Sequence, residues 1–96
     1  MSKLRKSARG EQCQMRSSIC NGNPETTVLC HINSHRYGKG MGIKANDLAA
    51  FYGCSSCHDL YDGRNSNGDS KSELETMALH AVVATHIRMK ETGVIK

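Results

Sequence analysis

Four of the five cysteines form two pairs whose spacing suits a metal ion. Cys54 and Cys57 enclose two serines in a C-x-x-C motif, and six residues separate Cys13 from Cys20. Four thiolates arranged as two pairs can complete the closed tetrahedral sphere of a structural zinc site. The C-x-x-C pair is the stronger signal, because the wider pair exceeds the spacing usual in zinc knuckles. The sequence therefore predicts a structural Zn²⁺ site made by these four residues, against the alternative of unrelated buried cysteines.

His58 follows Cys57 directly, which allows a second interpretation. The segment from Cys54 to His58 also fits the C-x-x-C-H motif that attaches c-type haem, with the histidine as axial ligand. Haem attachment is normally extracytoplasmic, and residues 1–10 lack the apolar stretch of a secretory signal. It would also leave Cys13 and Cys20 without a role. Zinc is the favoured interpretation.

Size and composition indicate why a metal is needed. A chain of 96 residues with one Phe and no Trp can bury little apolar surface, so a stabilising cross-link is expected. In a reducing compartment cysteines bind metal more often than they form disulfides. No window approaches the roughly 18 apolar residues of a membrane span. We therefore expect a cytoplasmic protein without a membrane partner.

The positive charge is concentrated near the N-terminus. The net charge is +4, and four Lys and Arg residues precede the first acidic residue. Such an arm can bind phosphates by releasing counterions, although it could equally be a solvated, frayed terminus. We predict a basic arm at 1–10 and a single zinc-bound domain at 11–96. The candidate nucleic-acid contacts lie in the arm, in the glycine-rich segment 34–42 and just beyond that segment. They are Lys3, Arg5, Lys6, Arg9, Arg36, Lys39 and Lys44.

Three stretches are expected to form the elements that position these residues. The β-branched run 26–32 predicts a strand, and the apolar run 48–52 predicts a strand in preference to a short helix. Ser72 and Glu75 fit a capping box, and apolar residues at helical spacing follow until Gly93. We expect this C-terminal helix to pack its apolar face on the core, with His80 and His86 as surface or boundary residues.

Three segments read Leu-Cys-His-Ile at 29–32, Asp-Leu at 47–48 and Cys-Ser-Ser-Cys-His at 54–58. Together they resemble the motif of HNH or His-Me finger nucleases in its zinc-stapled form. Nearly the whole chain also resembles the small lambdoid-prophage proteins of the YbcO type, which are named as nucleases. The resemblance implies a ββα-metal core, so the fold expected is a small α+β domain in which a zinc-stapled HNH-like unit carries an additional C-terminal helix. It also implies the cytoplasm of a bacterial host.

The same resemblance implies roles for individual residues. His31 would be the general base, and Asp47, or else Asn46, would orient it. His58 would bind a catalytic divalent cation such as Mg²⁺, Mn²⁺ or Zn²⁺. Cys30 stands where many family members carry a second ligand, and its thiolate would favour a softer cation than Mg²⁺.

These observations predict a metal-dependent endonuclease that hydrolyses DNA phosphodiester bonds. The alternative is a non-catalytic zinc-knuckle protein that binds DNA or acts as an adaptor through its basic residues. The sequence leaves the oligomeric state and any base preference open.

Overall fold

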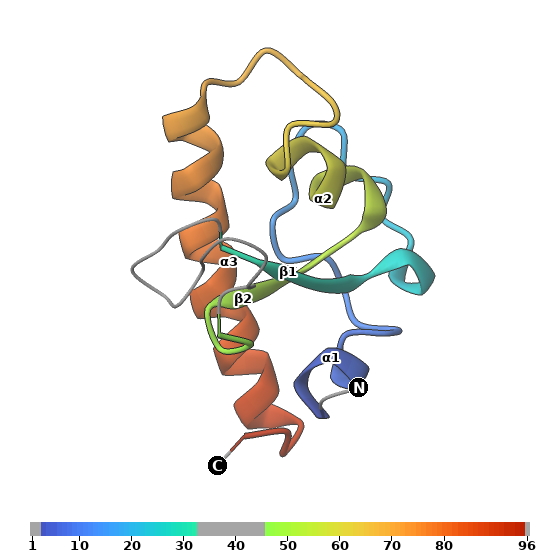
Figure 1. Cartoon of the computed structure of the whole chain (residues 1–96). Coiled ribbons are helices and arrows are strands. Elements are labelled where there is room, and N and C mark those ends of the chain that lie inside the picture. The colour runs from blue at the N-terminus through green and yellow to red at the C-terminus, as the bar shows by residue number, and fades with distance from the viewer. Residues whose placement is uncertain (1–2, 33–45, 96) are drawn as a thin grey trace.

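The computed structural model describes residues 3–32 and 46–95 and folds them into a small α+β arrangement, the class that was predicted (Figure 1). The elements in order are α1 (Lys3–Ser7), a 3₁₀ turn η1 (Pro24–Thr26), β1 (Val28–His31), β2 (Ala50–Gly53), α2 (Ser55–Tyr61) and α3 (Lys71–Glu91). Within the described ranges, no helix has the length and apolar character needed to cross a membrane.

The two strands form an antiparallel pair. Val28 lies opposite Gly53 and His31 lies opposite Ala50. Both predicted strands are confirmed, although β1 is shorter than the run 26–32 and β2 is displaced toward the C-terminus of the run 48–52. Helix α2 begins directly after β2, so the described chain contains two strands and a helix in the order β1, β2, α2.

Residues on opposite faces of this small sheet enter two different clusters. Because side chains alternate along a strand, Cys30 and Phe51 share one face while His31 and Tyr52 project from the other. The first face packs against the cysteine-rich segment, α2 and the first half of α3, in a cluster of Cys13, Met15, Cys30, Ile32, Phe51, Cys54, Cys57, Leu60, Ala78 and Ala81. The second face packs against α1 and the end of α3, in a cluster of Ala8, Leu29, Ala50, Tyr52 and Met89.

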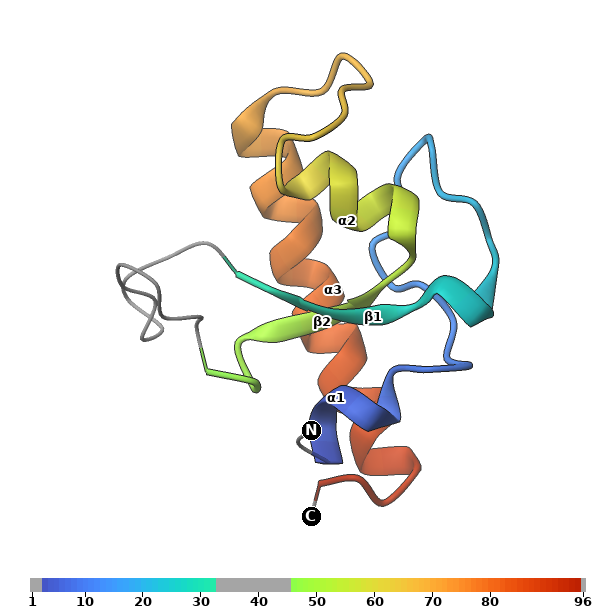
Figure 2. The same cartoon turned by 45° about the vertical axis from the view of Figure 1, so that its right-hand side comes forward.

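Helix α3 crosses behind both strands and links the two clusters (Figure 2). Its buried residues are Ala78, Ala81, Thr85 and Met89, which recur at the helical spacing expected from the sequence. Thr85 is fully buried, and its hydroxyl oxygen accepts a hydrogen bond of 2.9 Å from the backbone N–H of Tyr52. This bond ties the middle of β2 to the helix.

The start of α3 corrects the predicted capping box, which was placed two residues too late. Ser70 is the N-cap, and its hydroxyl accepts a hydrogen bond of 3.2 Å from the N–H of Glu73. The Glu73 carboxylate accepts one of 3.0 Å from the N–H of Ser70. The backbone of Ser70 is extended, as a cap requires, whereas Ser72 already lies inside the helix. The predicted end is confirmed, since Gly93 follows the last turn with a φ of 77°.

The basic N-terminal segment is attached to the sheet. The Ser7 and Tyr52 hydroxyls form a hydrogen bond of 2.7 Å, and Ala8 is 1% exposed. Both views show α1 beside the strands near the C-terminal end of α3 (Figures 1 and 2). The backbone that carries the cationic residues therefore has a defined position next to β1.

Candidate functional site

Four cysteines from two distant parts of the chain converge on one point. The sulfur atoms of Cys13, Cys20, Cys54 and Cys57 all lie within 4.8 Å of one another, and the Cys54 and Cys20 sulfurs are 3.7 Å apart. Sulfur ligands of a tetrahedral zinc ion, at about 2.3 Å from the metal, are separated by about 3.8 Å. Elsewhere in the described ranges, no other set of three or more His, Cys, Asp or Glu side chains converges in this way. The four residues could therefore hold a metal ion such as zinc.

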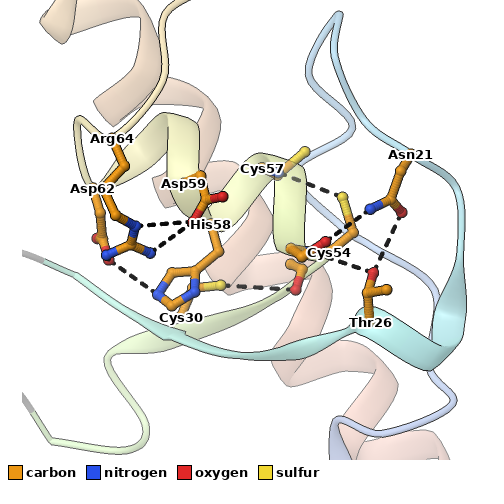
Figure 3. Close-up of polar contacts among 11 residues, drawn as sticks. Asn21, Thr26, Cys30, Cys54, Cys57, His58, Asp59, Asp62 and Arg64 are labelled. Carbon is orange, nitrogen blue, oxygen red and sulfur yellow. Dashed lines mark hydrogen bonds and ion pairs between the residues drawn. The ribbon is translucent and has the colours of Figure 1, made fainter.

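The local structure around α2 orients the C-x-x-C pair. Cys54 is the N-cap of α2, and its sulfur accepts a long hydrogen bond of 3.5 Å from the N–H of Cys57. Asn21 donates to the Ser55 hydroxyl at 3.0 Å, and the N–H of Ser55 donates to the Thr26 hydroxyl at 3.2 Å (Figure 3). These bonds attach the start of α2 to the segment that follows Cys20.

The electrostatics of the cluster favour a bound cation. A hydrogen bond from Cys57 lowers the pKa of Cys13 to about 4. The same contact, together with burial, raises the pKa of Cys57, and burial raises that of Cys20. Four thiols this close cannot all ionise in a buried site unless a positive charge compensates them. A divalent metal ion supplies that charge and replaces the protons.

A second group of side chains lies at the end of β1. His31 Nε2 is 2.7 Å from Asp47 Oδ1, and the same carboxylate oxygen is 3.5 Å from Nε of Arg5. The His31 side chain is 12% exposed and the Asp47 side chain 22% exposed. The side-chain oxygen Oδ1 of Asn46 instead accepts a hydrogen bond from the N–H of Leu48. The structure therefore brings Asp47, rather than Asn46, to His31.

His31 also borders a cavity of about 390 Å³ between α1 and β1. Three of its lining side chains are cationic, and all three belong to the predicted nucleic-acid contacts. The full lining is Arg5, Lys6, Arg9, Thr27, Val28, Leu29 and His31. Sequence reasoning proposed the basic residues and the histidine separately, and the fold places them around one space. Lys3 is exposed on α1 and is not part of this lining.

His58 lies on α2, away from this cavity lining. Its Nε2 atom is 3.0 Å from Asp62 Oδ2, and Asp62 also contacts Arg64 at 3.3 Å. The His58 and Asp62 side chains are 33% and 25% exposed, and the His58 ring extends from α2 toward β1 (Figure 3). Sequence reasoning did not single out Asp62. Its i,i+4 spacing from His58 is the signal that could have found it, because such residues meet on one helix face.

Cys30 lies in the apolar core. It is 0% exposed, and its thiol makes long hydrogen bonds to the carbonyl oxygens of Gly53 at 3.8 Å and Val28 at 3.7 Å. Burial raises the pKa of Cys30, which favours the neutral thiol over the thiolate that binds metal. The assignment of Cys30 to a catalytic cation stays a prediction that these surroundings do not favour. The candidates Arg36, Lys39 and Lys44 lie outside the described residues.

Comparison with known proteins gives a consistent result. Residues 2–94 match the family model described as "Putative nuclease YbcO". The chain is 44% identical over 97 aligned positions to proteins of that name from Escherichia coli K12 and from Enterobacteria phage 82, covering 100% of this chain and 99% of each relative. A solved structure described as a putative bacteriophage protein from E. coli K-12 aligns with a TM-score of 0.76 at 38% identity. It covers 95% of this chain and 100% of the other.

Proposed function

The chain belongs to the YbcO family of proteins named as nucleases, and from this premise we propose that it hydrolyses DNA phosphodiester bonds with His31 as the general base. The observation that carries the proposal is the hydrogen bond between His31 and Asp47 at the edge of a cavity lined by Arg5, Lys6 and Arg9. Here a histidine with a defined orientation meets cationic side chains that can bind phosphate.

The His31 and Asp47 contact fixes which ring nitrogen can act. With its proton on Nε2, His31 donates to the Asp47 carboxylate, and Nδ1 is left as the acceptor. Nδ1 takes a proton from water as the water oxygen attacks phosphorus and the bond to the leaving oxygen breaks. Asp47 stabilises the imidazolium that results, while Arg5 holds the carboxylate in place. The Asp carboxylate of a Ser-His-Asp triad orients its catalytic histidine in the same way.

A catalytic cation is part of the proposal. His58 and Asp62 offer an imidazole and a carboxylate 3.0 Å apart on one partly exposed helix face, a donor set that suits Mg²⁺, Mn²⁺ or Zn²⁺. Because α2 packs on the face of the sheet opposite His31, a cation bound there would approach the phosphate from the α2 side and stabilise its negative charge. The order β1, β2, α2 supports a ββα-metal unit of the HNH type, with structural Zn²⁺ in the four-cysteine cluster.

Plasmid DNA cleavage tests the catalytic assignment. Wild type, His31→Ala and the control His80→Ala are compared with Mg²⁺, Mn²⁺, Zn²⁺ or EDTA. We expect cation-dependent nicking that falls by about 100-fold or more in His31→Ala, because a positioned general base contributes that much. His80 is exposed on α3, so its substitution matches the chemical change without touching the cavity.

The proposal fails if His31→Ala cleaves as fast as His80→Ala. DNA affinity, measured on the same variants by fluorescence anisotropy, separates the two functions that the sequence allowed. Binding without cleavage under every metal condition would assign the chain to the non-catalytic DNA-binding or adaptor class.

A further inference from the structure

Thr27 carries a buried polar atom for which the described part of the chain provides no partner. The residue lies between η1 and β1 and is 3% exposed. Its backbone N–H donates to the Pro24 carbonyl at 3.1 Å, but its Oγ1 has no hydrogen-bond partner within the described ranges. Burying a hydroxyl in this state costs stability, so an unpaired one needs an explanation. Thr27 lines the cavity that His31 also borders, so a ligand in that cavity is the candidate partner for Oγ1.

The cationic side chains around the same cavity indicate the charge of that ligand. Lys6 and Arg9 line it from the end of α1 and the turn that follows, and neither forms an ion pair with an acidic residue that the structure describes. Arg5 lines the cavity as well and shares the Asp47 carboxylate with His31. A neutral hydroxyl donor beside guanidinium and ammonium groups is a donor set for an oxyanion.

The position of the cavity points to the source of the oxyanion. Its walls are the segment that carries the basic residues and the strand that ends at His31, so the Thr27 end and the His31 end belong to one continuous space. A nucleic-acid strand presents phosphates in series, whereas inorganic phosphate presents one. A polynucleotide with one phosphate at His31 could place a further phosphate of the same strand along β1.

We propose that the cavity between α1 and β1 is a subsite for a second phosphate of the strand attacked at His31, bound by the Thr27 hydroxyl and by Lys6 and Arg9. The inference rests on the proposed function and deepens it, because it makes the substrate a polynucleotide held by at least two of its phosphates. The site positions the strand and carries no base recognition.

Direct binding tests the subsite without needing turnover. The probe is a short fluorescein-labelled single-stranded oligodeoxynucleotide, titrated without added divalent cation against the full zinc-loaded chain carrying His31→Ala. Thr27→Val, Thr27→Ser, Arg9→Gln and the control Lys90→Gln are added to that background. Lys90 is an exposed lysine on α3 outside the cavity lining, so it matches the loss of one charge.

The hydroxyl and the charge should leave different signatures. Arg9→Gln is expected to lower the slope of log affinity against log salt concentration by roughly one relative to Lys90→Gln. Thr27→Val should weaken binding by about 10-fold with the slope unchanged, because it removes a neutral donor to a charged group. Thr27→Ser keeps the hydroxyl and should bind close to the parent.

Three outcomes would overturn the subsite. The first is a Thr27→Val chain that gains thermal stability and binds the oligonucleotide as well as its parent, which would make the hydroxyl merely an unpaired group. The second is equal salt slopes for Arg9→Gln and Lys90→Gln. The third is Thr27-dependent binding of inorganic phosphate without any such dependence for the oligonucleotide.

Failure of the subsite and failure of the proposed nuclease activity are distinguishable. A chain that never cleaves DNA but shows the Thr27 and Arg9 signatures retains the subsite and loses the catalytic assignment. A chain that cleaves through His31 without those signatures retains the activity and loses the subsite.

Discussion

The four-cysteine cluster yields the sharpest test of how this chain is held together. We predict that Cys57→Ser abolishes stoichiometric zinc binding and unfolds the domain, whereas Cys30→Ser does neither. Both cysteines are 0% exposed, so the two substitutions make the same chemical change at equally buried positions. They differ in that Cys57 belongs to the four-cysteine metal site and Cys30 does not.

The expected magnitude follows from the size of the chain and the position of the cluster. A domain of 96 residues has a free energy of unfolding of roughly 5 to 14 kcal/mol. A structural zinc ion contributes about 10 to 16 kcal/mol in small zinc-bound domains, which is as much as the whole. Cys30→Ser should cost only about 1 to 3 kcal/mol, since it places a hydroxyl in an apolar cluster close to the Gly53 carbonyl.

Metal content and thermal unfolding are measured on the same preparations. Wild type and Cys30→Ser should each contain about one zinc per chain and unfold cooperatively, with a large fall in the melting temperature when a strong zinc chelator is added. Cys57→Ser should contain no zinc and show no cooperative transition. The reasoning is refuted if wild type contains no metal and stays folded in chelator, or if Cys57→Ser lowers the melting temperature no more than Cys30→Ser.

Two further predictions follow from the buried groups. Zinc affinity should rise by at least about 100-fold per pH unit between roughly pH 6 and 8. The reason is that the pKa values of Cys20 and Cys57 are raised, so both thiols must lose a proton when metal binds. Competition with a chromophoric chelator at several pH values measures this affinity, and an affinity that does not change with pH would contradict the prediction. Thr85→Val should lower the free energy of unfolding by about 1 to 3 kcal/mol, since it leaves the buried N–H of Tyr52 unpaired. Thr85→Ser keeps that bond and should cost less in the same denaturant titration, so equal losses would contradict the explanation.

Local patterns in the sequence were sufficient for most of the elements. The β-branched run at 26–32 and the helical spacing after residue 74 depend on neighbouring side chains, and both gave elements of the predicted type. The start of α3 was misplaced because Ser70 and Ser72 stand equally well before an acidic residue three positions later. Only the backbone geometry decides which serine is the cap.

The sequence by itself determined the four-cysteine set, since two pairs of one residue type with a C-x-x-C spacing already define a ligand group. It also identified His31 and the basic residues as candidates, but only one by one. The tertiary structure decided that His31 faces Asp47 and shares a cavity with Arg5, Lys6 and Arg9, and that Cys30 belongs to the core. It also decided that the Thr27 hydroxyl is buried without a hydrogen-bond partner among the residues that the structure describes. The reason is strand geometry, because side chains alternate along a strand and those of Cys30 and His31 therefore project from opposite faces of the sheet. Which element covers each face depends on packing between residues far apart in the chain.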